Sequence, residues 1–224
     1  VWIGGSGNWN DPANWSGGVV PNNGTPAGTT YNVFIDNGNV NFSTVTITTP
    51  ISIDDLSIST NDTLTINNGA SLTVVNSGAG TGAIANNGTI RLSGGPNFTD
   101  LIIDGDVYVM GNGTIHMFGG IKNRIYALSA TDTLTNDGNT IHGSGNIGNN
   151  SMTLNNQSTI RANTFETLTI DPAGGGCING GLIEALGGFN TLVLNDGAFN
   201  NTGGTIFANS GKVEVNAGAL VTGG

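Results

Sequence analysis

Residues 139–170 read NTIHGSGNIGNNSMTLNNQSTIRANTFETLTI, and this stretch contains the phrase Thr-Ile twice, at Thr140-Ile141 and Thr159-Ile160. The phrase recurs along the chain at Thr89-Ile90, Thr114-Ile115 and Thr205-Ile206, with Leu182-Ile183 in the remaining interval. Successive isoleucines of this set are 25, 26, 19, 23 and 23 residues apart. A repeat of this length that drifts by a few residues is typical of a solenoid, because the strands must stay in register while the turns between them vary.

Two further apolar segments follow each phrase in the later repeats. The first alternates with a period of two, as a strand with one buried face does, at Leu168-Thr169-Ile170, Leu192-Val193-Leu194 and Val213-Glu214-Val215. The second is a single apolar point at Ile178, Phe199 and Leu220. Three strands per repeat predict an all-β fold, a right-handed parallel β-helix (β-solenoid) with three faces, about 20–25 residues per coil and roughly nine or ten coils.

Stacked coils would place equivalent residues in ladders. One inward ladder is predicted to contain Ile90, Ile115, Ile141, Ile160, Ile183 and Ile206. A second, two residues further on, contains Leu92, Met117, Gly143, Ala162, Ala185 and Ala208. The position between them faces outward and contains Arg91, His116, His142, Arg161, Glu184 and Phe207. This cationic stripe on an acidic chain is a candidate contact for an acidic glycan or a neighbouring solenoid; the alternative is a set of solvent-exposed rungs without a partner.

The composition fits many short strands joined by tight turns. Only 9% of the residues are charged while 37% are hydrophobic, and the chain contains 38 Gly and 33 Asn. Gly and Asn are the residues that best tolerate positive φ, so they suit corners. The net charge of −10 with five Lys and Arg argues against a nucleic-acid partner, and no apolar run is long enough to insert in a membrane.

The two ends of the chain differ. Residues 1–32 contain all three tryptophans, Trp2, Trp9 and Trp15, and are predicted to form an N-terminal cap over the first coil. A sugar-stacking platform made by the same rings is the alternative. Residues 33–224 are predicted to form the coils, and the last of them shows no cover, so either more coils follow or another subunit stacks there. Head-to-tail association of copies is therefore a candidate interaction.

The opening segment resembles that of large bacterial β-helix surface proteins, namely autotransporter passengers and proteins with filamentous-haemagglutinin-like repeats. The shared pattern is Trp2-x-Gly4-Gly5-x-Gly7-x-Trp9-x-Asp11-Pro12-x-Asn14-Trp15, followed by Gly17-Gly18-x-x-Pro21. The phrase Asn139-Thr140-Ile141-x-Gly143-x-Gly145-x-Ile147-Gly148 is similar to their repeat coils. The resemblance implies an exported protein that serves as an adhesin, stalk or matrix component. Residues 34–66 match this pattern least well, which leaves the register of the coils before residue 67 open.

Candidate catalytic and metal-binding residues are few. Glycoside hydrolysis needs two carboxylates across the scissile bond, and the candidates are Asp54 with Asp55 and Asp104 with Asp106. Adjacent strand residues point to opposite faces, and the second pair flanks Gly105 in a turn, so we expect no catalysis.

Two places could hold a metal ion. The stretch from Asp36 to Asn39 reads as a turn that could hold calcium, and His116 with His142 could form a two-histidine metal pair. The alternatives without a ligand are favoured, so no metal or cofactor is expected. Cys177 is expected to be buried and inert.

The sequence thus predicts a secreted or cell-surface structural or adhesive segment of a bacterial protein, such as a stalk, an adhesin or a subunit of a self-assembling filament. The expected partners are the chain itself or surface glycans. A carbohydrate-binding module is the first alternative. A polysaccharide lyase or hydrolase on the same fold is the second.

Overall fold

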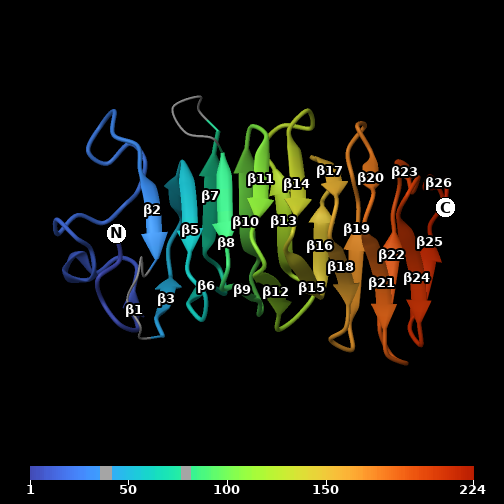
Figure 1. Cartoon of the computed structure of the whole chain (residues 1–224), viewed down its shortest axis with the longest axis horizontal. Helices are drawn as coiled ribbons and strands as arrows, with labels where there is room; N and C mark the ends of the chain where they lie inside the picture. Colours follow the sequence, from blue (N-terminus) through green and yellow to red (C-terminus); the bar gives the residue numbers. More distant parts are fainter. Residues whose placement is uncertain (36–41, 77–81) are drawn as a thin grey trace.

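The computed structural model describes residues 1–35, 42–76 and 82–224 and shows a β-solenoid of about eight turns. Figure 1 shows the coils stacked along the long axis, with the N-terminal segment at one end and the last strands at the other. All pairing between named strands is parallel, and each strand pairs with the equivalent strands of neighbouring coils. The predicted parallel β-helix with three faces is confirmed, while the number of coils is smaller than the nine or ten expected.

Three sheets run along the solenoid, and we call them the first, second and third sheet. The first contains β1 (Gly7–Asn8), β3 (Thr44–Ile47), β6 (Thr63–Asn67), β9 (Thr89–Ser93), β12 (Thr114–Phe118), β15 (Thr140–Gly143), β18 (Thr159–Ala162), β21 (Leu182–Leu186) and β24 (Thr205–Asn209). The second contains β4 (Ile51–Ile53), β7 (Ser71–Val75), β10 (Thr99–Asp104), β13 (Asn123–Ala127), β16 (Gly145–Gly148), β19 (Thr167–Ile170), β22 (Thr191–Leu194) and β25 (Lys212–Val215). The third contains β2 (Asn32–Ile35), β5 (Asp55–Ile58), β8 (Ala83–Asn86), β11 (Val107–Met110), β14 (Thr133–Asp137), β17 (Thr153–Asn156), β20 (Cys177–Asn179), β23 (Ala198–Asn200) and β26 (Leu220–Thr222).

The isoleucine ladder of the first sheet is confirmed rung by rung. Ile115 pairs with Ile90 on one side and Ile141 on the other, and the same register continues to Ile206. The ladder extends back through Leu64 to Val45, so the coils before residue 67 follow the same register. Residues from Ile90 to Ile183 in this ladder are fully buried. Because one coil cannot bury its inward residues alone, this shared spine is what makes the stack stable.

The third sheet corrects one prediction. Ile178 and Leu220, two of the three apolar points that marked this strand in the sequence, are 46% and 64% exposed and do not belong to the core. The register pairs Leu154 with Cys177, then Cys177 with Phe199. A shift of one residue moves a strand's side chains to the other face. Cys177 therefore fills the inward rung and Ile178 points to solvent.

The corner between β15 and β16 explains the shortest repeat, the 19 residues from Ile141 to Ile160. Only Ser144 separates the two strands, and Gly143 holds a φ of +123°. A Cβ on Gly143 would lie 2.0 Å from the carbonyl oxygen of Met117 in the preceding coil. The close approach of two coils here requires glycine.

We expect Gly143→Ala to lower the free energy of unfolding by roughly 3 kcal/mol or more, because the added methyl group meets backbone and the positive φ is strained. Urea unfolding followed by circular dichroism measures the change. Gly174→Ala is the matched control, since a Cβ there meets nothing within 4 Å. Equal stability of the two variants would contradict the close approach.

Candidate functional site

The outward row of the first sheet is the candidate site. Strand register stacks Arg91, His116, His142, Arg161, Glu184 and Phe207 on six successive strands. The row begins earlier with uncharged residues, Asn8, Thr46 and Thr65. The stacking expected from the sequence is therefore present, and we call this set the outward row.

His116 and His142 form the centre of the outward row. Their rings stack with centroids 4.3 Å apart and planes 17° from parallel. Nδ1 of His142 lies 3.3 Å from Oδ1 of Asn163, which fits an Nδ1–H donor on the neutral ring. Burial, then the neighbouring His142, then Arg91 lower the pKa of His116 to about 4, and burial also lowers the pKa of His142. Both rings are therefore neutral at pH 7.

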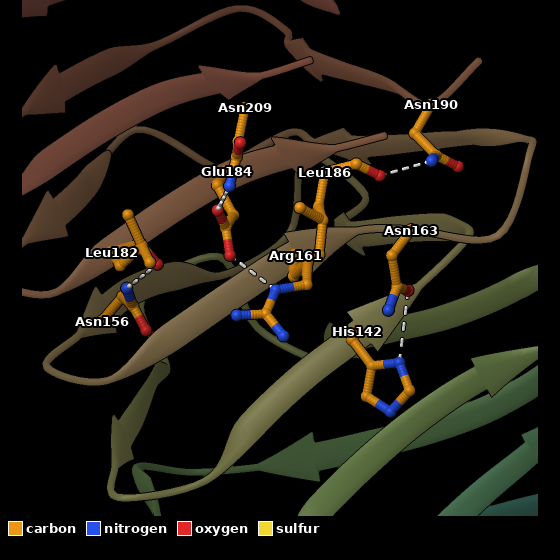
Figure 2. A network of polar contacts seen from close by, with 9 residues as sticks. All are labelled: His142, Asn156, Arg161, Asn163, Leu182, Glu184, Leu186, Asn190 and Asn209. Atoms are coloured by element: carbon orange, nitrogen blue, oxygen red, sulfur yellow. Dashed lines mark hydrogen bonds and ion pairs between the residues drawn. The ribbon is translucent and has the colours of Figure 1, made fainter. Parts of the chain in front are cut away.

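Arg161 forms an ion pair within the row. Its Nε donates to Oε1 of Glu184 over 2.6 Å, and Asn209 Nδ2 donates to the other carboxylate oxygen over 3.3 Å. Figure 2 shows these side chains projecting from adjacent strands, with His142 and Asn163 beside them. The Glu184 side chain is only 4% exposed. Such a buried carboxylate requires a partner, so the Arg161 charge is used within the protein.

The remaining cations also have partners. The Arg91 guanidinium lies 3.9 Å from the centroid of the Phe118 ring, and Arg124 pairs with Asp100 through two hydrogen bonds. Lys122 donates to the carbonyl of Pro96, and Lys212 pairs with Glu214. All five cations of the chain are thus engaged internally. The outward row therefore presents the stacked imidazole rings and the Phe207 ring to a partner rather than free positive charge.

The tryptophans lie elsewhere, at the N-terminal end of the solenoid. Trp2, Trp9 and Trp15 are 2%, 0% and 2% exposed, and their rings meet edge to face. Trp9 Nε1 donates to the carbonyl of Pro21, and Trp15 Nε1 to the carbonyl of Trp9. The only helix among the described residues, η1 (Pro12–Asn14), lies in this segment. Because the rings are buried, none presents a face on which a sugar could stack.

The Trp-bearing segment also pairs with the first coils. β1 adds to β3 of the first sheet, and the Trp2 amide donates to the carbonyl of Phe34 in β2. These contacts use strand edges that the first coil would otherwise leave unpaired.

A buried asparagine ladder was missed by the sequence reasoning. It runs along the corner between the third and first sheets, where Asn136 Nδ2 donates to Asn156, Asn156 to Asn179, and Asn179 to Asn201. The three distances are 2.9, 2.8 and 2.7 Å. An Asn placed two residues after the inward residue of the third strand was the available signal, as in Leu154-x-Asn156 and Cys177-x-Asn179. The amount of Asn elsewhere in the chain obscured it.

Other candidate groups are separate from the outward row. Burial raises the pKa of the Cys177 thiol to about 12. Asp54 is buried and accepts a hydrogen bond from Asn23, while Asp55 begins β5 and accepts one from the Ala83 amide. Asp106 accepts from the Thr133 amide in the next coil. Asp36 to Asn39 lie outside the described residues.

Over the described ranges, the surface shows no pocket and no group of three or more His, Cys, Asp or Glu that could hold a metal ion. No described helix has the length and hydrophobicity to cross a membrane. Comparison with protein-family models, curated proteins and solved structures found no match.

We expect Asn179→Ala to cost roughly 2–3 kcal/mol of unfolding free energy, because it leaves Asn201 Oδ1 without its donor and opens a small cavity. Thermal and urea unfolding measure the loss. Asn155→Ala is the control, since Asn155 faces outward from β17 beside the ladder. Similar losses in the two variants would show that the cost does not come from the buried ladder.

The histidine pair predicts acid sensitivity. The folded pKa of His116 is about 4, below its unfolded value of 6.5, so the unfolded chain binds more protons between these values. The free energy of unfolding is therefore highest above pH 6.5 and decreases as the pH falls towards 4. After discounting for solvent exposure, we expect His116 to account for a decrease of about 1 kcal/mol. The double variant His116→Gln/His142→Gln should show a shallower fall of stability across this window than the parent, and parallel curves would refute the assignment.

Proposed function

We propose that this chain is a structural and adhesive β-solenoid segment displayed outside a bacterial cell. The observation that carries the proposal is the uninterrupted, in-register stack, in which three sheets share one core along the whole described chain. Each coil adds about 4.8 Å, so about eight turns make a stiff body roughly 40 Å long. A stack of this kind extends by adding coils and so suits a stalk.

The surface chemistry supports an extracellular location. Only five Lys and Arg are present, and all of them are held in internal contacts. Proteases that cleave after Lys or Arg therefore have five possible sites, and four of these lie within strands, where cleavage needs local opening of the backbone. The single cysteine, Cys177, is buried, so its thiol is protected from oxidation in an oxidising extracellular environment.

The coil of β24, β25 and β26 shows how a solenoid of this kind extends. Its strands β24, β25 and β26 pair on one side only. The inward residues Val215 and Val221 are 55% and 37% exposed there, whereas the equivalent Leu194 and Phe199 one coil earlier are buried. Such a strand edge and core are covered by a further coil, whether of the same chain or of another. The Trp-bearing segment occupies the opposite end, so that end offers fewer free strand edges.

Surface labelling tests the proposal. Antibody raised against the purified chain should label intact producing cells, and brief proteinase K treatment of those cells should remove the label. A cytoplasmic protein probed in the same samples is the control for lysis. Antigen confined to the cytoplasmic fraction would overturn the extracellular assignment.

A further inference from the structure

The phenylalanines of this protein lie in unusual places. Seven of the eight are exposed by between 42% and 81%, and only Phe199 is buried in the core. Phenylalanine is normally among the residues most often buried. Outward positions of a solenoid are not needed for its core. Phe98 and Phe118 lie against the guanidinium groups of Arg124 and Arg91, at 3.8 and 3.9 Å from the ring centroids, but the folding of the coils does not explain the other exposed rings.

Five of the seven exposed rings gather along one side. Phe118 and Phe207 lie on the first sheet, and Phe98, Phe165 and Phe189 lie in the corners that lead from the first sheet to the second. Phe165 and Phe189, on successive coils, have ring centroids 6.4 Å apart and are 76% and 81% exposed.

The histidine pair lies between Phe118 and the strand that leads to Phe165. Phe118 contacts His116 with centroids 5.4 Å apart, and His116 stacks on His142. His142 in turn bonds Asn163, two residues before Phe165. We call the five phenylalanines and the two histidines the aromatic ridge.

The ridge is large enough to form an interface. Taking about 200 Å² for a phenylalanine side chain, its five rings expose roughly 600 Å² of aromatic surface per copy. A stable interface buries about 800 Å² per partner, rim included. The Phe165–Phe189 pair is its most exposed part, and apolar area of this amount on one side of a soluble protein points to an interaction site.

The charges are distributed unevenly around the solenoid. All five cations lie on the first sheet, in the following corner or near the start of second-sheet strands, where Asp100, Glu166, Glu184 and Glu214 are interleaved with them. The corner between the second and third sheets is different. Its described residues contain no Lys or Arg but include Asp54, Asp55, Asp104, Asp106, Asp132, Asp171 and Asp196.

This distribution favours a second copy as the occupant of the ridge. Two chains that each carry a net charge of −10 repel one another. The ridge side is close to neutral, so copies approach there at the lowest electrostatic cost, and the acidic corners then point apart. A two-fold contact also places the same surface of each copy against that of the other, so the exposed rings of one copy would bury those of its partner.

We propose that two copies of this protein associate side by side through the aromatic ridge, related by a two-fold axis near Phe165 and Phe189. This contact goes beyond the proposed stalk function and uses a different surface from the strand edges of β24, β25 and β26. Lateral association would double the thickness of the rod without lengthening it.

Sedimentation equilibrium across protein concentration tests the proposal. The parent should form a dimer that becomes tighter at 0.5 M NaCl than at 0.05 M, because salt screens the repulsion between the acidic chains. Phe165→Ser/Phe189→Ser should weaken the dimer at least tenfold. Phe34→Ser is the control, since Phe34 is 42% exposed on the third sheet. A parent that stays monomeric in both salts, or a dimer that the double variant leaves unchanged, would overturn the proposal.

Cysteine cross-linking tests the two-fold arrangement. Gly188, beside Phe189, is exposed, and a Cβ there has only the carbonyl oxygen of Ser210 within 4 Å, at 3.7 Å. Gly188→Cys should give a disulfide-linked dimer under mild oxidation. Gly174→Cys, at an equally open position in the corner between the second and third sheets, should stay monomeric. The native Cys177 is buried and does not compete. Cross-linking of Gly174→Cys alone would contradict a contact through the ridge.

Discussion

Parallel pairing in register between successive coils is the constraint on which this structure depends. Each strand of an interior coil bonds to the coil before and the coil after, so every inward residue stands on its equivalent. Moving one strand by a single residue would expose an isoleucine of the spine and bury a charged or aromatic neighbour such as Arg91 or His116. The fold therefore tolerates variable corners, while it permits little change in the order of residues within a strand.

The polar interior follows from the same constraint. Coils that stack at about 4.8 Å bring equivalent corner residues within hydrogen-bonding distance, and a buried amide supplies both a donor and an acceptor. The ladder from Asn136 to Asn201 uses this geometry to satisfy buried groups between coils. It stops at Asn136, whose Oδ1 has no donor among the described residues, because the preceding rung is occupied by Val109.

The sequence predicted the first sheet well because its inward residues repeat as isoleucine after threonine. It predicted the third sheet less well, since the inward rung there passes from Leu154 through a cysteine to Phe199 and leaves Ile178 as a misleading apolar neighbour. The stacking of the outward row followed directly from the first sheet. The pairing of side chains within the outward row could not be predicted, because the contact between Arg161 and Glu184 depends on the direction of side chains from two neighbouring coils. The burial of the tryptophans likewise depends on how residues 1–32 return onto the first coil.

A solenoid separates the residues that make the fold from those that meet a partner. Inward positions are fixed by the stack, while outward positions are free of it, so an outward side chain that is costly to expose carries information about function. Arg161 and Glu184 pair with each other, so their positions say little about a partner. Phe165 and Phe189 have no such explanation, because most of each ring is exposed to water and its one ring contact is with the other phenylalanine on the neighbouring coil. The sidedness of these rings, opposed to a corner without cations, gives a structurally uniform rod one face that is suited to association.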